Sequence, residues 1–409
     1  MKRLLLLFLL LPCAAQARPP PDPALLPTIS LLTFAPGEIY WQRFGHNALL
    51  VRAPSGEATV YNYGIFDFQQ KNFFLNFARG RMWYRLGTDS LWRTLAVYQR
   101  ENRWVVEQRL NLLPVQAREL ADFLAWNAKP ENANYRYDYF RDNCSTRVRD
   151  AIDRALSSAL QRQLETQRTS VSYRHESVRM MSPIVPLALG IDLVDGPASE
   201  APLNVWQQSF LPEVFMQALR DAYQLTPDGI RLPLVAAEGK LLSGSALQAP
   251  SQPLSFFWVF LAAGVLFGGA LLWLTHLRAR AVARITFAAL AASFTLIGGV
   301  AGVILLLIWT LTEHWAWQAN FNLLLLNPLG FLLLPTWIRS AKLQWPIPVW
   351  TRICVRVIAG LATLSLLAPQ TNGAWIALLL PAHWALAAII LRHPLGAFLS
   401  PKTPNRENQ

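Results

Sequence analysis

Apolar residues are distributed unevenly along this chain. Before about residue 250 they are mixed with polar and charged residues, whereas from Leu254 onward they form long, nearly continuous runs. The runs cover residues 254–275, 285–311, 323–338, 353–368 and 374–391. Each run is close to the roughly 20 residues that a membrane helix needs. The pattern therefore predicts five membrane-spanning helices, of which the third is short and interrupted at Asn327-Pro328.

The chain between residues 28 and 235 has the mixed pattern of a globular domain with both strands and helices. Asn47–Arg52 and Ala58–Tyr63 read as two strands on either side of the turn sequence APSGE, which predicts a β-hairpin. Beginning at Cys144, apolar residues recur at intervals of three and four, which predicts a helix. The fold class expected for this part is therefore α+β.

The N-terminus has the pattern of a secretory signal peptide. Two basic residues precede the apolar run Leu4–Leu11, and a small-x-small cleavage sequence ends at Ala17. Cys13 offers a second interpretation, a lipoprotein anchor, but Pro12 stands where small residues are usual. Cleavage after Ala17 is therefore favoured, and the globular domain is expected to be exported.

These patterns divide the chain into five parts. They are a signal peptide (1–17), an exported domain (18–235), a small and polar linker (236–253), a membrane domain (254–395) and a tail (396–409). Lysines and arginines gather in the loops after the first and third helices and in the tail, and are absent from the other two loops. Such residues mark the cytoplasmic side, so the C-terminus is expected in the cytoplasm. The net charge of +12 then needs no nucleic-acid partner to explain it.

Cys144 is the candidate nucleophile. Cys13 lies in the signal peptide and Cys354 in an apolar run, so the exported domain offers Cys144 no disulfide partner. It begins the predicted helix directly after Asp142-Asn143, which are good N-cap residues. Unpaired N–H groups and the helix dipole at this position favour the reactive thiolate. The alternative is an inert, buried structural thiol.

A thiol nucleophile usually needs an imidazole base, and the exported domain contains only His46 and His175. His175 lies in a segment with the pattern of a surface helix. Folding the hairpin about its turn places His46 and Asn62 on one face, as diagonal neighbours. An amide in that place would hold the tautomer of the imidazole, the third role in a Cys-His-polar triad. A shifted register would give this role to Asp67 instead.

The loop between the second and third membrane helices, TEHWAWQANFN, is expected on the same side of the membrane as Cys144. Its tryptophans fit an interfacial belt. His314, Asn320 and Asn322 are less well explained by a belt, because polar groups at that depth need partners. We expect this loop to dock under the exported domain and to hold a phospholipid headgroup near Cys144. His314 is a secondary candidate for assisting proton transfer, after His46.

Four segments in this order resemble the Lnb family: FGHNALLVR, VYNYGIFDF, YRYDYFRDNCSTRVRDAI and EHWAWQANFNLLLLNPL. The resemblance covers nearly the whole mature chain. It implies a periplasmic domain of the permuted papain-like (NlpC-type) superfamily, in which the histidine precedes the cysteine as in lecithin–retinol acyltransferase. It also implies that His46 and Cys144 are the catalytic pair of a lipoprotein N-acyltransferase. The third catalytic residue is not fixed by it.

Three functions fit the sequence. The first is a cysteine acyltransferase of the bacterial inner membrane, with a phospholipid as acyl donor, a lipoprotein as acceptor and no cofactor or metal. The second is a cysteine amidase that cleaves cell-wall peptides, for which one membrane anchor would suffice. The third is a membrane scaffold without activity, in which Cys144 is merely buried.

Overall fold

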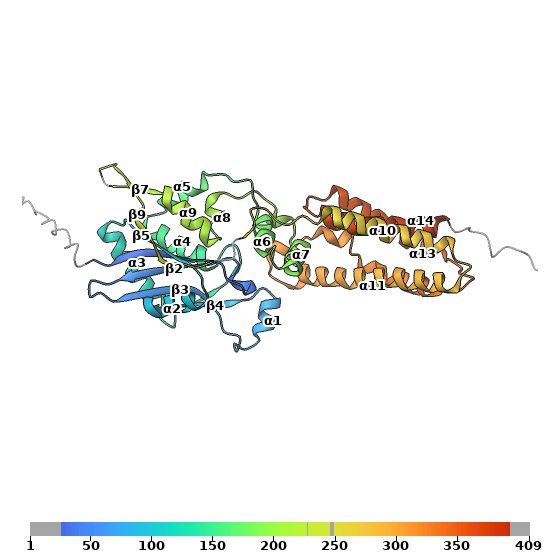
Figure 1. Cartoon of the computed structure of the whole chain (residues 1–409), viewed down its shortest axis with the longest axis horizontal. Helices are drawn as coiled ribbons and strands as arrows, with labels where there is room; N and C mark the ends of the chain where they lie inside the picture. Colours follow the sequence, from blue (N-terminus) through green and yellow to red (C-terminus); the bar gives the residue numbers. More distant parts are fainter. Residues whose placement is uncertain (1–25, 227, 246–248, 393–409) are drawn as a thin grey trace, which may run out of the picture.

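The computed structural model describes residues 26–226, 228–245 and 249–392. The signal peptide with Cys13, the start of the exported domain and the tail (396–409) lie outside the described residues. The molecule is elongated, with a domain of strands and helices at one end and a bundle of long helices at the other (Figure 1). An α+β domain followed by five candidate membrane spans is what the sequence predicted.

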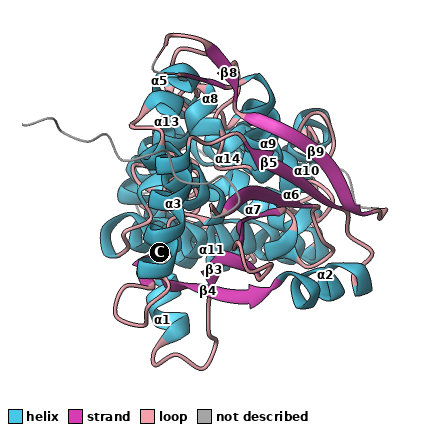
Figure 2. Ribbon diagram, turned by 90° about the vertical axis from the view of Figure 1, so that its left-hand side faces the viewer, coloured by secondary structure: helices cyan, strands magenta, loops and turns pink. Residues whose placement is uncertain are grey.

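Seven strands form one antiparallel sheet in the order β6-β4-β3-β2-β1-β5-β9. They are β1 (Thr28–Phe34), β2 (His46–Arg52), β3 (Ala58–Ile65), β4 (Trp83–Ser90), β5 (Val105–Leu110), β6 (Asn134–Arg136) and β9 (Val235–Leu242). In the end-on view, β4 and β9 lie on opposite sides of the molecule (Figure 2). The central strands β1 and β2 are almost entirely buried, because helices cover both of their faces. A separate hairpin consists of β7 (Tyr223–Leu225) and β8 (Arg231–Pro233).

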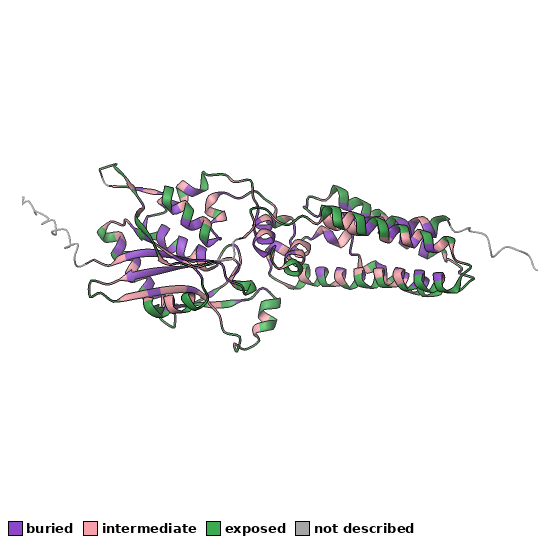
Figure 3. Ribbon diagram, viewed as in Figure 1, coloured by how far each residue is buried: buried purple, intermediate pink, exposed green. Residues whose placement is uncertain are grey.

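Nine α-helices belong to the described part of this domain. They are α1 (Phe73–Ala78), α2 (Leu91–Arg100), α3 (Pro114–Asn127), α4 (Cys144–Ala155), α5 (Ala159–Glu165), α6 (Tyr173–Met181), α7 (Val185–Val194), α8 (Val205–Gln208) and α9 (Pro212–Asp221). Strand side chains alternate between the two faces of the sheet. Leu49 therefore packs in a core with Leu120 of α3 and Val148 of α4, whereas the adjacent Leu50 packs in a second core with Leu95 of α2. The central strands β1 and β2 are correspondingly among the most buried parts of the domain (Figure 3).

The register predicted for the β2–β3 hairpin is confirmed. Arg52 pairs with Ala58 and Leu50 pairs with Val60, so the turn lies where the sequence placed it. Gly56 in that turn has a φ of +89°, a conformation that glycine adopts without strain. Because the pairing fixes which residues share a face, His46 and Asn62 come to the same face of the sheet.

The sheet extends beyond residue 235, where the sequence indicated the start of a linker. The residues from Val235 to Leu242 form strand β9, which pairs with β5 at the edge of the sheet. Most of its side chains are exposed, since an edge strand is held by main-chain hydrogen bonds rather than by an apolar face. Small and polar residues satisfy that role, which is why the composition resembled that of a linker.

Five stretches of the described chain are long and apolar enough to span a membrane. Four are helical: α10 (Phe257–His276), α11 (Ala281–Leu311), α13 (Val349–Leu364) with a 3₁₀ turn after it, and α14 (Gly373–Arg392). The other stretch, Trp315–Arg339, consists of short 3₁₀ turns followed by α12 (Leu334–Arg339). Its predicted interruption is present, because the Asn327 side chain accepts a hydrogen bond from the Leu329 N–H and starts a new turn at Pro328.

Candidate active site

Cys144 is the first residue of helix α4, as predicted. The side-chain oxygen of Asn143 accepts hydrogen bonds from the N–H groups of Ser145 and Thr146, each at 2.9 Å. Asparagine at this position is a strong N-cap and contributes about 1 kcal/mol to the helix. Asp142, the other predicted cap residue, forms an ion pair with Arg147 instead. The cap therefore fixes the helix start at Cys144 and leaves the thiol at its first turn.

His46 and Asn62 are in contact. The Nε2 atom of His46 lies 3.3 Å from the Oδ1 atom of Asn62. An amide oxygen can only accept a hydrogen bond, so Nε2 is the nitrogen that carries the proton. The Nδ1 atom is then the basic nitrogen of the ring. Asp67, which a shifted register would have used, is exposed, and its carboxylate accepts a hydrogen bond from the Gln69 N–H.

The start of α4 is tied to β2 at the residue that follows His46. The main-chain N–H groups of Asn47, Ser145 and Cys144 favour the thiolate form of Cys144 and so act to lower the pKa of the thiol. The side-chain amide of Asn47 donates to the Ser145 hydroxyl at 3.0 Å. That hydroxyl in turn donates to the carbonyl oxygen of Ser209 at 2.7 Å. Residues 98 positions apart in the chain are thus fixed beside the thiol.

Burial decides the charge state of the pair. Burial raises the pKa of Cys144 to about 11, although the N–H groups around the sulfur favour the thiolate. Burial lowers the pKa of His46 to about 4, and its hydrogen bond to Asn62 opposes this shift. At neutral pH both groups are therefore uncharged. The sequence indicated that N–H groups at the helix start favour the thiolate; they do lower the pKa of Cys144, but burial acts in the opposite direction and has the larger effect.

We expect the alkylation rate of Cys144 by a small soluble reagent to keep rising with pH, toward pH 11. The reason is that only the thiolate reacts and that burial raises the pKa of the thiol to about 11. The rate would be measured by following iodoacetamide adducts over a pH series. A Cys144→Ser variant reports the background from Cys354, the other described free thiol. A plateau below the ordinary cysteine pKa of about 8.5 would contradict this assignment.

Two features of the site were not identified from the sequence. Gly64 has a φ of +93°, and a Cβ atom there would lie 3.5 Å from the Cβ of Cys144, so the β3 backbone passes close to the nucleophile. The β3–β4 pairing shifts its register between Asn62 and Ile65, around this glycine. Tyrosines also surround the thiol: the charge of a thiolate at Cys144 would raise the pKa of Tyr98 and Tyr137 further, beyond the effect of their burial. The glycine that follows Tyr61-Asn62-Tyr63 was the sequence signal that could have indicated this close approach of β3 to Cys144.

The loop after α11 docks against the exported domain, as predicted. Glu313 accepts hydrogen bonds from Arg81 and Arg136 at 2.6 and 2.7 Å. The Nε2 atom of the buried His314 lies 3.0 Å from the carbonyl oxygen of Phe77 in α1. These contacts attach α1 and the β4–β6 edge of the sheet to the end of a membrane helix.

Asn320 and Asn322 of the same loop contact the end of α7. The Asn320 amide donates to the carbonyl oxygens of Leu193 and Val194, and the Asn322 amide donates to that of Leu193, all within 2.9 Å. Both residues are buried. Carbonyl groups at a helix C-terminus lack partners within the helix, so these amides satisfy them. The described contacts of the two asparagines thus join the domains, and contact with a headgroup remains a prediction.

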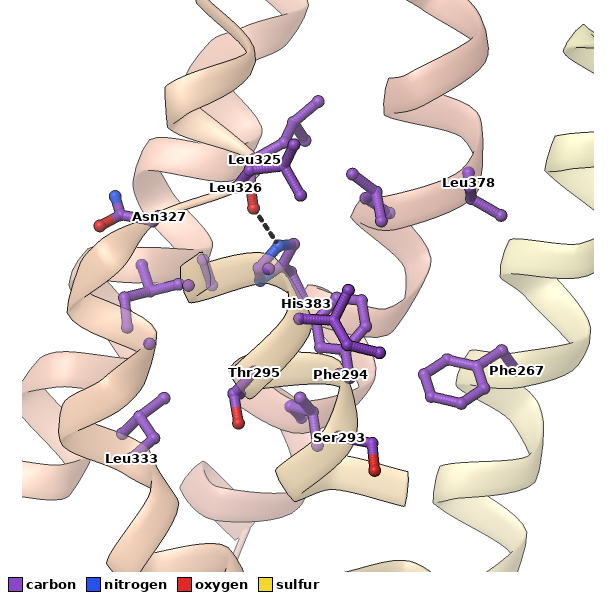
Figure 4. Close-up of a pocket in the computed structure, with 18 of the residues that line it drawn as sticks. Phe267, Ser293, Phe294, Thr295, Leu325, Leu326, Asn327, Leu333, Leu378 and His383 are labelled. Atoms are coloured by element: carbon purple, nitrogen blue, oxygen red, sulfur yellow. Dashed lines mark hydrogen bonds between the residues drawn. The ribbon is translucent and has the colours of Figure 1, made fainter. Parts of the chain in front are cut away.

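The membrane domain contains an apolar cavity of about 480 Å³. Phe267, Phe294, Leu326 and Leu333 are among its lining residues (Figure 4). The one titratable side chain in this lining, His383, is bonded through Nε2 to the carbonyl oxygen of Leu325 at 2.9 Å. The cavity belongs to the membrane spans and is separate from the thiol. Within the described residues, no cluster of histidine, cysteine and carboxylate side chains has the arrangement of a metal site.

Comparisons with known proteins identify a family for both domains. The Lnb N-terminal periplasmic domain matches residues 26–181, and the Lnb transmembrane domain matches residues 246–393. No curated protein and no solved structure matches the chain. The first match contains the His46–Asn62 pair and Cys144, and the second contains all five candidate spans. The chain therefore belongs to the Lnb family, with a periplasmic domain joined to a multi-pass membrane domain.

Proposed function

We propose that this protein is a membrane-anchored cysteine acyltransferase that moves a fatty acyl chain from a phospholipid to the N-terminal amine of a lipoprotein. One observation carries the proposal: Asn47, the residue after His46, donates a hydrogen bond to Ser145, the residue after Cys144, while the His46 ring is held by Asn62. A thiol, a base and an orienting amide are the three parts of a cysteine nucleophile site. Membership of the Lnb family agrees with this chemistry.

The first half of the reaction forms a thioester. Nδ1 of His46 takes the proton of the Cys144 thiol as the sulfur attacks the ester carbonyl of the phospholipid. The main-chain N–H groups of Asn47 and Cys144, which favour the thiolate form of Cys144, are candidates for stabilising the oxyanion. The tetrahedral intermediate collapses, the ester C–O bond breaks, and His46 returns the proton to the departing lysophospholipid oxygen. The acyl group is then on Cys144 and the imidazole is neutral again.

The second half transfers the acyl group to nitrogen. The neutral N-terminal amine of the lipoprotein attacks the thioester carbonyl, and His46 takes one of its protons. The C–S bond breaks, an amide forms, and the proton returns to the Cys144 sulfur. A neutral resting pair suits the whole cycle, because the cycle begins and ends with the thiol, and the imidazole is uncharged at the start and end of each half. The thiol is half-buried, which limits the access of water that would compete with the amine.

The junction between the domains supports a membrane-bound substrate. Residues of the loop after α11 hold the periplasmic domain to the membrane domain. His314 contacts α1, and Asn320 and Asn322 contact the end of α7. A further ion pair and hydrogen-bond set joins Asp192 to Arg174 and to Trp375 of the last span. A peptide-cleaving enzyme would gain little from such a junction, whereas an enzyme that takes its substrate from the bilayer must keep its site at the bilayer surface.

An acyl thioester on Cys144 should accumulate when the amine acceptor is withheld. Nucleophilic catalysis separates acylation from transfer, so the second step stops without an amine. Purified protein in phospholipid nanodiscs would be examined by intact-mass spectrometry for a fatty-acyl adduct that hydroxylamine removes. Adding a lipopeptide with a free N-terminus should discharge the adduct and give an N-acylated product.

The same experiment separates the alternatives. Cleavage of a cell-wall peptide without any acyl adduct would identify an amidase. Absence of both reactions, with a thiol that resists alkylation at high pH, would leave only the scaffold. The loop charges predict a cytoplasmic C-terminus, and with that orientation the proposed reaction would occur at the periplasmic surface of the inner membrane.

A further inference from the structure

An exposed apolar surface lies at the end of the periplasmic domain that contacts the membrane helices. We call it the aromatic patch, and define it as seven residues, each at least 38% exposed: Ile39, Tyr40, Trp41, Phe68, Phe74, Leu75 and Phe77. Phe74 is the most exposed of them, at 75%. The helix α1, which carries three of the seven, is green over much of its length in Figure 3. Contiguous apolar surface of this kind marks a site of interaction.

The patch is one connected surface. Trp41 packs edge-on against Phe68 with ring centroids 6.0 Å apart, and Phe68 packs against Phe73 at 5.1 Å. Phe73 contacts both Phe74 at 5.4 Å and Phe77 at 6.3 Å. The rings therefore form a continuous layer from the turn before β2 to the end of α1.

The chain itself sets the depth of this patch. The Glu313 N–H donates to the carbonyl oxygen of Arg79, directly after α1, at 2.9 Å. Glu313 is only two residues beyond Leu311, the last residue of the membrane helix α11. Ile304, Leu307 and Leu311 are exposed apolar residues, so the lipid-facing surface of α11 continues to its end. Figure 1 shows α1 beside this end of α11. The patch is consequently level with the periplasmic face of the bilayer.

Aromatic rings also lead inward from the patch to the candidate site. Phe73 stacks on Phe66 at 6.1 Å, and Phe66 contacts Tyr84 at 5.1 Å. Tyr84 stacks on Tyr137 at 4.2 Å. Tyr137, Tyr84 and Cys144 pack against the same buried core. An apolar chain that left the bilayer at α1 would therefore have aromatic surface along its way to the thiol.

We propose that the aromatic patch dips into the periplasmic leaflet and is the place where a phospholipid acyl chain leaves the bilayer for Cys144. Aromatic side chains favour the headgroup–acyl boundary, where they bury their rings at low cost. The contact of the aromatic patch with lipid is inferred from its apolar surface and its depth. The delivery of the acyl chain to Cys144 rests, in addition, on the proposed acyltransferase function.

A photocrosslinking experiment tests the contact without relying on activity. The full chain with Cys144→Ser would carry benzoylphenylalanine in place of Phe74, in nanodiscs of phosphatidylethanolamine and phosphatidylglycerol. Irradiation should add the mass of a phospholipid at this position. Trp92 is the matched control, because it is 67% exposed but lies in α2 near the hairpin turn at Gly56, at the end of β2 opposite His46. Crosslinks to a second protein chain, or no more lipid adduct than at Trp92, would overturn the proposal.

A kinetic experiment tests the delivery. Phe74→Asp should slow acylation of Cys144 from bilayer phospholipid by about tenfold, since a charge replaces a ring that is worth roughly a factor of ten in burial. Alkylation of Cys144 by soluble iodoacetamide should be unchanged, and Trp92→Asp should behave as wild type in both assays. Equal acylation rates for Phe74→Asp and Trp92→Asp would refute delivery through the patch. If the wild-type thiol takes no acyl chain at all, the proposed function fails, whereas the crosslinking result still decides the lipid contact.

Discussion

Replacing Cys144 with serine should abolish acyl transfer, with kcat/KM falling by at least about a thousandfold. A hydroxyl is a far weaker acid than a thiol, and the surroundings that raise the pKa of Cys144 to about 11 would suppress ionisation of a serine even more. The neutral His46 cannot compensate, since burial already lowers its pKa to about 4. The measurement is the transfer of a labelled acyl chain from phospholipid to a synthetic lipopeptide, followed by mass spectrometry.

A matched control is available in the same chain. Cys354 is the other free cysteine of the described residues and lies in α13, within the membrane domain. Cys354→Ser should retain normal transfer, which excludes a general effect of thiol loss. The Cys144→Ser protein should still fold, because serine preserves the N–H pattern and the Asn143 cap at the start of α4. Normal transfer by Cys144→Ser would refute the catalytic assignment.

The parts of this protein that could be predicted from sequence are those fixed by local patterns. The hairpin register follows from the position of its turn, and one turn determines every pair along β2 and β3. The helix start at Cys144 follows from its cap, and the five spans follow from the length of the apolar runs. Each of these features depends on neighbours in the sequence, so an isolated chain is sufficient to identify it.

The parts that could not be predicted depend on what packs around a residue. The pKa of Cys144 is raised chiefly by burial, and residues far from it in the sequence, such as Tyr98, lie near enough to interact with its charge. A capping pattern reports only the local N–H groups, so the sequence showed their effect on the pKa of Cys144 but not the opposing effect of burial. The partners of Asn320 and Asn322 are carbonyl oxygens at the end of α7, and a main-chain acceptor has no signature in the side-chain sequence. Strand β9 was missed for the same reason, since an edge strand is defined by its pairing.

Removing the base should have a large effect, and removing the residue that orients it a small one. His46→Gln should lower kcat/KM for acyl transfer by about 100- to 10,000-fold, the usual contribution of a general base. Asn62→Ala should lower it by about fivefold, because one hydrogen bond of about 1 kcal/mol holds the Nε2 proton and the ring angle. Asp67→Ala is the control, and it should leave transfer unchanged, since its exposed carboxylate only caps a turn. The three variants would be compared in one nanodisc preparation, with folding checked by circular dichroism.

The order of these effects distinguishes a working triad from a histidine that merely fills space. The ring centroids of His46 and Phe34 lie 5.6 Å apart. If His46 served only to pack against Phe34, His46→Gln would be tolerated, and Asn62→Ala and Asp67→Ala would have equal effects on transfer. If Asp67 were the orienting residue, its loss would be the damaging one, which would require a register different from the observed pairing of Arg52 with Ala58. The tautomer of the neutral imidazole gives a further test. The hydrogen bond to Asn62 keeps the proton on Nε2; without it the ring can adopt the other tautomer, in which Nδ1 carries the proton and cannot accept one. Asn62→Ala should therefore reduce kcat more than it changes KM, because the substrate still binds while fewer molecules hold the base in its active form.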